Sequence, residues 1–155
     1  MATNALIKSE SFQTGERAES VFERVAKKGH FKVRKANRDQ NINQHIDFFI
    51  SCYHFNFSVD VKARKKISRG DSEVNDAWTW IEFKNVRGRP GWLYGKADYI
   101  AFEREFDFLL VNRYKLIEFC EDKINLENIV PSTHLAEYAA YQRKGRKDLI
   151  SRVCM

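Results

Sequence analysis

The sequence has little of what interrupts or cross-links a chain. Its three cysteines, Cys52, Cys120 and Cys154, are an odd number without CxxC spacing, which argues against a disulfide framework or a recognisable zinc site. Two prolines and seven glycines leave long stretches for helices and strands, and 43% hydrophobic residues supply a core. The 155 residues fit one ordinary domain, so we expect a single domain over residues 1–155 with a basic C-terminal segment.

Long hydrophobic runs are also missing. No apolar stretch approaches the roughly 18 residues that span a bilayer, and the first residues are too short and weakly charged for a signal peptide. We therefore expect a soluble, intracellular protein without a membrane partner.

Acidic residues are fewer than basic ones. Lys and Arg number 27 against 21 Asp and Glu, a net charge of +6. This balance favours a polyanionic partner. Charge alone does not separate nucleic-acid binding from a basic subunit that interacts with proteins, so both remain open here.

Hydrophobic spacing predicts an α/β chain. Ala18, Val21, Phe22 and Val25 form one helical stripe, which predicts a helix over residues 15–28 that ends at Gly29. A strand over 30–36, a polar loop over 37–43 and a hairpin of strands 45–51 and 57–64 follow. Further strands are expected at 78–84, 92–95, 98–103 and 108–112, a basic turn at 85–91, and helices at 114–123 and from Pro131 onward. We expect one central mixed β-sheet flanked by α-helices.

The sharpest feature is an acid and a lysine two apart in an apolar strand. Period two places Asp60 and Lys62 on one face, about 7 Å apart along the strand. The other strand of the hairpin carries Asp47 at its centre, so a second carboxylate would converge on Asp60 there. The alternative interpretation is a solvent-facing ion pair on an edge strand.

Adjacent carboxylates repel one another unless a cation joins them. Hard oxygen ligands of this kind suit Mg²⁺ or Mn²⁺. Such an ion activates water and offsets charge on a phosphodiester, while a neighbouring lysine orients the water or binds the phosphoryl oxygen. Glu82 and Lys84 are a second pair of this type, and they are the alternative catalytic residues.

The order of these residues resembles the PD-(D/E)xK nuclease superfamily, most closely its Holliday-junction-resolvase-like and restriction-endonuclease-like members. The likeness covers the N-terminal part of the chain, as far as about Lys65. It comprises a helix with Glu19 at the family's usual distance before the helix-ending Gly29, a strand, Asp47, and the triplet Asp60-Val61-Lys62. Two positions depart from the family pattern, because Ile46 stands in place of proline and Asp60 in place of the commoner glutamate.

The resemblance implies a restriction-endonuclease-like core and a metal-dependent DNA endonuclease. Asp47 and Asp60 would bind Mg²⁺ or Mn²⁺ with the main-chain carbonyl of Val61, Glu19 would assist, and Lys62 would position the attacking water. Residues 60–71, 80–88 and 91–103 also look like small nuclease-like proteins of phage and viral genomes, which would act inside a host cell.

Basic residues flank the predicted site in the sequence and are candidates for contacts with DNA phosphates. They are Arg64, Lys65, Lys66, Arg87, Arg89 and Lys96. A non-catalytic nucleic-acid-binding module that keeps a nuclease-like scaffold is the alternative function. A homodimer is the simplest arrangement for cutting two strands with one site per chain, and the sequence leaves the oligomeric state open.

Overall fold

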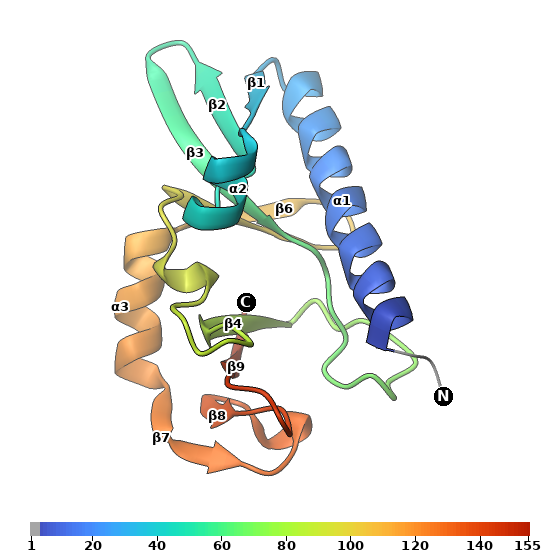
Figure 1. Ribbon diagram of the computed structural model, residues 1–155. Helices are drawn as coiled ribbons and strands as arrows, with labels where there is room; N and C mark the ends of the chain where they lie inside the picture. The colour runs from blue at the N-terminus through green and yellow to red at the C-terminus, as the bar shows by residue number, and fades with distance from the viewer. Residues whose placement is uncertain (1–3) are drawn as a thin grey trace. The chain divides into compact units, whose positions relative to one another are not determined.

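The structure is a computed structural model that describes residues 4–155 (Figure 1). Side chains are described from Phe12 onward. Over these residues the chain is α/β, with three α-helices and two mixed β-sheets. It divides into two compact units. Unit 1 comprises the chain up to residue 63 and residues 97–110, and unit 2 comprises residues 64–96 and 111–155.

Unit 1 contains a five-stranded sheet in the order β1-β2-β3-β5-β6. Its elements are α1 (Asn4–Lys28), β1 (Lys32–Lys35), α2 (Arg38–Gln44), β2 (Phe48–Cys52), β3 (Phe55–Lys62), β5 (Tyr99–Glu103) and β6 (Phe108–Asn112), whose last two residues belong to unit 2. Strand β3 is antiparallel to β2 and parallel to β5, so it is an interior strand of the sheet.

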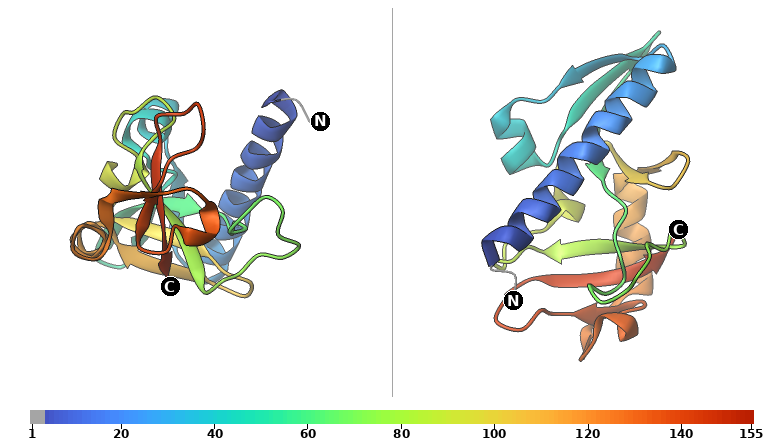
Figure 2. Two further views of the ribbon diagram at one scale, coloured as in Figure 1. Left: turned by 90° about the horizontal axis from the view of Figure 1, so that it is seen from below. Right: turned by 90° about the vertical axis from the view of Figure 1, so that its right-hand side faces the viewer.

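The core of unit 1 lies between α1 and this sheet, and Figure 2 shows the long helix beside the strands. Phe22 stacks on Phe48 with ring centroids 5.7 Å apart and meets the edge of Phe108 at 5.2 Å. Ala18 and Phe22 are buried as the helical stripe predicted, whereas Val25 is 50% exposed. The buried face of α1 is therefore narrower than the spacing of its hydrophobic residues indicated.

Unit 2 contains a four-stranded sheet in the order β4-β9-β8-β7. Its elements are β4 (Trp78–Lys84), η1 (Trp92–Tyr94), α3 (Arg113–Lys123), β7 (Asn125–Val130), η2 (Thr133–Leu135), β8 (Ala139–Tyr141) and β9 (Leu149–Cys154). The predicted single central sheet is wrong, because β4 pairs with the C-terminal strand β9 in a second sheet.

Three further predictions of local structure are wrong. Residues 37–43 are not a loop, because Asn37 and Gln40 form a reciprocal capping box that starts α2. Residues 92–95 are not a strand, because Trp92–Tyr94 form the 3-10 turn η1, which closes when the N–H of Gly95 donates to the carbonyl of Trp92 at 2.9 Å.

The predicted C-terminal helix from Pro131 is replaced by η2 and β8. Tyr138 has φ +50°, which an α-helix does not accommodate. Its N–H instead donates to the carbonyl of Arg152, and the N–H of Arg152 donates to the carbonyl of Ala136. This segment therefore runs alongside β9 and is bonded to it. The first helix ends where predicted but begins at Asn4, eleven residues before the predicted start at Gly15. The remaining predicted helices and strands are present within a few residues of their expected limits. Across the described residues, no helix has the length and apolar character needed to cross a membrane.

Candidate active site

Asp60 is a buried carboxylate in the middle of the unit 1 sheet. It lies on β3 between Val59 and Val61, and only 3% of it is exposed. Ser58, Val59, Asp60 and Val61 are all buried, so β3 is covered on both faces. The alternative of a solvent-facing pair on an edge strand is therefore wrong.

Asp47 lies next to Asp60 across the hairpin. Phe48 pairs with Val59, so the preceding Asp47 comes opposite Asp60. The main-chain N–H of Asp47 donates to the Val59 carbonyl at 2.8 Å. In return, Asp47 Oδ2 accepts from the N–H of Val61 at 2.7 Å. These two hydrogen bonds continue the β2–β3 pairing by one residue and hold the Asp47 carboxylate next to Asp60.

Asn41 fixes the other oxygen of the Asp47 carboxylate. Its Nδ2 donates to Asp47 Oδ1 at 2.6 Å. Sequence reasoning missed Asn41 because it treated residues 37–43 as a loop. The capping residues Asn37 and Gln40 were the available signal, since a helix that begins there directs Asn41 toward the start of β2.

Lys62 forms an ion pair with Asp60. Its Nζ lies 2.7 Å from Asp60 Oδ1. The second oxygen, Asp60 Oδ2, is buried and has no hydrogen-bond partner among the described residues. Burial raises the pKa of Asp60 to about 7; the charge of Lys62 lowers the pKa and that of Asp47 raises it. A cation beside Oδ2 would compensate this carboxylate.

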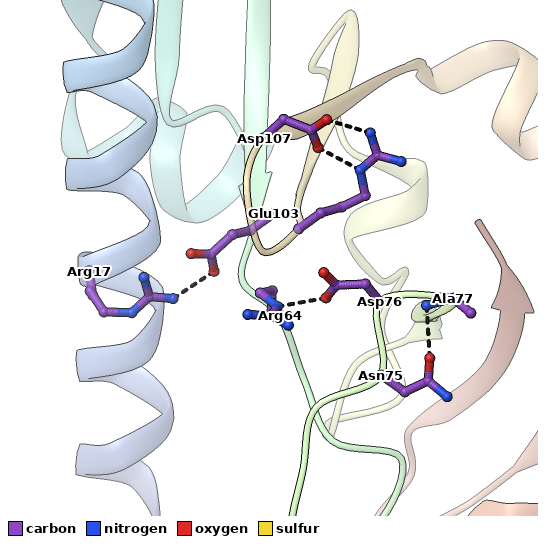
Figure 3. A network of polar contacts seen from close by, with 8 residues as sticks. Arg17, Arg64, Asn75, Asp76, Ala77, Glu103 and Asp107 are labelled. Atoms are coloured by element: carbon purple, nitrogen blue, oxygen red, sulfur yellow. Dashed lines mark hydrogen bonds and ion pairs between the residues drawn. The ribbon is translucent and has the colours of Figure 1, made fainter.

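Glu19 approaches the same cluster from α1. Burial raises the pKa of Glu19, and the charge of Asp47 raises it further, while Lys35 and Lys62 act in the opposite direction. Its carboxylate lies 3.9 Å from Lys35 Nζ. Figure 3 shows Arg17, on the same helix, donating to the buried Glu103 of β5 at 2.6 Å. This ion pair ties the Glu19 segment of α1 to the sheet.

His45 borders the cluster at the end of α2. It has φ +53°, and its main-chain N–H caps the helix by donating to Gln40. Burial and the charge of Lys62 lower the pKa of the imidazole, against the influence of Asp47. These influences favour the neutral form of the imidazole.

The main chain of Val61 adds an oxygen on the Asp47 side of β3. Within a strand, the N–H and C=O groups of one residue point to the same edge. Since the Val61 N–H donates to Asp47, the Val61 carbonyl faces that edge as well. The family resemblance implied a role for this carbonyl as a metal ligand.

The donors in this cluster are oxygens, which match Mg²⁺ and Mn²⁺ in kind. They are the adjacent carboxylates of Asp47 and Asp60 and the carbonyl of Val61. Among the residues that the structure describes, no group of three or more His, Cys, Asp or Glu side chains is arranged to hold a metal ion. The orphaned oxygen of Asp60 is the feature that fits a cation.

The alternative pair Glu82 and Lys84 belongs to β4 in the sheet of unit 2. A register shift in the β4–β9 pairing separates these two residues. The regular same-face spacing expected for them is therefore interrupted, whereas Asp60 and Lys62 keep it on β3.

The six predicted DNA-contacting residues all belong to unit 2. Arg64 forms an ion pair with Asp76 at 2.6 Å (Figure 3). The others are exposed side chains: Lys65, Lys66, Arg87, Arg89 and Lys96.

Comparison of the chain with protein-family models, with curated proteins and with solved structures found no match.

Proposed function

We propose that the protein is a metal-dependent DNA endonuclease of the PD-(D/E)xK type, with a restriction-endonuclease-like core in unit 1. The observation that carries the proposal is the buried Asp60 carboxylate, paired with Lys62 through one oxygen and lacking a hydrogen-bond partner at the other. A buried carboxylate oxygen without a hydrogen-bond partner is costly even when the other oxygen is paired. Proteins retain such groups mainly where they serve a site.

The neighbours of Asp60 support a cation over a purely structural ion pair. Asp47 lies opposite Asp60 and adds a second negative charge. The single positive charge of Lys62 does not neutralise both carboxylates. Its geometry is fixed by Asn41 and by the Val61 N–H. A pair of carboxylates held in place by its surroundings is the arrangement expected of a preorganised ligand set.

Each residue then has a role in phosphodiester hydrolysis. Asp47 and Asp60 would hold Mg²⁺ or Mn²⁺ together with the Val61 carbonyl, and Glu19 would assist from α1. A bound Mg²⁺ lowers the pKa of water and offsets charge on the phosphate. Lys62, which Asp60 already holds in place, would orient the attacking water.

Plasmid nicking tests this proposal. With Mg²⁺ or Mn²⁺ the protein should convert supercoiled plasmid to open circles, and EDTA should stop the reaction. Asp60→Asn should lower the nicking rate by more than roughly 100-fold, because an amide keeps the shape but loses the charge that holds the ion. DNA binding measured in EDTA should remain.

Glu82→Gln is the matched control, because it neutralises the acid of the alternative pair and should leave nicking unchanged. Undiminished nicking by Asp60→Asn, or loss of nicking in Glu82→Gln alone, would contradict the assignment. Binding without metal-dependent cleavage of duplex, branched or single-stranded DNA would favour the non-catalytic nucleic-acid-binding module.

A further inference from the structure

The positive charge of the protein belongs to one of its two units. Unit 2 contains 16 Lys and Arg against 10 Asp and Glu, a net charge of +6, whereas unit 1 contains 11 of each and is neutral. The excess that the composition showed is therefore a property of unit 2. Part of it gathers in two short turns.

These turns are residues 84–89, which begin at the last residue of β4, and residues 142–147, between β8 and β9. Seven of their twelve residues are Lys or Arg and none is acidic: Lys84, Arg87, Arg89, Arg143, Lys144, Arg146 and Lys147. All seven are exposed except Arg143, which is intermediate. We call this surface the two-turn basic surface.

The two turns lie side by side although they are far apart in the sequence. The N–H of Lys147 donates to the carbonyl of Val86 at 3.3 Å. A Cβ added at Gly88 would lie 3.3 Å from the Lys147 Cβ, so the two backbones approach closely there. Two basic segments that the sequence keeps apart thus form one surface.

Local bonds hold both turns in shape. Asn85 Oδ1 accepts from the N–H groups of Arg87 and Arg89, at 2.9 and 3.2 Å. In the other turn, Arg146 N–H donates to the Arg143 carbonyl at 3.0 Å, and Arg143 forms an ion pair with the buried Asp148. The cations therefore project from ordered backbone, which lowers the entropy lost when they bind a partner.

We infer that the two-turn basic surface binds the phosphate backbone of duplex DNA and supplies affinity apart from the catalytic residues. The inference rests on the proposed function for the choice of DNA. Clustered Lys and Arg without acidic neighbours neutralise phosphates irrespective of sequence. Lys144, Arg146 and Lys147 extend the contact set beyond Arg87 and Arg89.

An anionic membrane is the competing partner for such a surface. Membrane binding of a basic surface gains from apolar side chains that enter the lipid. Within the two turns, Val86 is the single large hydrophobic residue, and it is 41% exposed. The composition of the surface therefore favours DNA.

The test is equilibrium binding of a fluorescent DNA duplex in EDTA, measured at several salt concentrations. Lys144→Gln/Arg146→Gln/Lys147→Gln should weaken binding at least roughly tenfold and reduce the slope of log K against log salt by about 2 to 3. Arg87→Gln/Arg89→Gln should reduce the slope of log K against log salt by about 2. Arg143 stays in place, because its loss would leave Asp148 buried without its partner.

The control is Lys28→Gln/Lys32→Gln/Lys115→Gln, which removes three exposed lysines elsewhere and changes the net charge as much as the triple turn variant does. It should keep most of the affinity and slope, and circular dichroism confirms that each variant is folded. Equal losses in the control and the turn variants would overturn the inference, as would binding to phosphatidylserine vesicles in place of DNA or to neither. Because no cleavage occurs in EDTA, such a failure is distinct from failure of Asp60-dependent nicking.

Discussion

The Asp60 carboxyl is buried, yet one of its two oxygens lacks a partner within the described part of the chain, which is unfavourable for a charged group in the absence of a cation. It is 3% exposed, and one of its oxygens accepts no hydrogen bond among the described residues. Burial raises its pKa to about 7. The side chain therefore costs folding free energy whenever it is ionised without a counter-ion at Oδ2.

This cost predicts that Asp60→Asn stabilises the metal-free protein in a pH-dependent way. Because the pKa is higher in the folded state, the folded protein binds the proton more tightly, and stability falls as the pH rises from the unfolded pKa toward about 7. In EDTA the variant should melt several degrees above the wild type at about pH 8, and this difference in melting temperature should disappear at about pH 4.

Thermal unfolding followed by circular dichroism measures this difference. Asp122→Asn is the control, since that carboxylate is 69% exposed and its replacement should alter melting little at either pH. A gap that is equal at both pH values, or a variant less stable than the wild type near about pH 8, would show that Asp60 is compensated within the protein itself.

The elements that sequence reasoning predicted well are those whose contacts are local. The β2–β3 hairpin joins Asp47 and Asp60 through a short stretch of chain, and alternation alone indicated both strands. In α1, spacing did not separate Glu19 from Glu16 and Glu23, and the family resemblance selected it. The structure provides the physical difference, because Glu23 pairs with Lys27 along the helix whereas Glu19 interacts with Asp47.

The elements that sequence reasoning missed depend on distant partners. Strand β4 ends at Lys84, and its partner β9 begins only at Leu149, near the other end of the chain. Leu135, Tyr138 and Ala139 have helical spacing, but the backbone of this segment bonds to Arg152 of β9 instead. Pairing with a strand so far along the chain is not visible in a local pattern.

The turn between β4 and η1 supplies a test of packing in unit 2. A Cβ at Gly91 would lie 2.3 Å from the carbonyl oxygen of Glu82, so Gly91→Ala forces the backbone of β4 or the turn to move. We expect a loss of about 1–3 kcal/mol in the free energy of unfolding, measured by urea denaturation.

Gly15→Ala is the matched substitution in α1, where a Cβ meets nothing within 4 Å. It should raise the free energy of unfolding by about 0.5–1 kcal/mol, because alanine restricts the unfolded chain and favours the helix. A Gly91→Ala variant as stable as the wild type would contradict the close packing of this turn against β4.

Across the whole molecule, the proposed chemistry and the proposed affinity belong to different units. The carboxylates and Lys62 lie in unit 1, which is neutral, and the two-turn basic surface lies in unit 2, which contributes the net charge of +6. Asp60 should therefore govern the rate of cleavage, and the basic turns should govern the strength of DNA binding. Composition alone showed the net positive charge of the chain but not that this charge belongs to unit 2.

The central claim is that Asp47 and Asp60 share one divalent cation. Anomalous diffraction from crystals of the protein soaked in Mn²⁺ tests it most directly, with Asp60→Asn crystals as the control. We predict one manganese peak within coordinating distance of both carboxylates and of the Val61 carbonyl, and its loss in the variant. A wild-type crystal with no peak at Asp60, or with the ion bound at Glu82, would contradict the account.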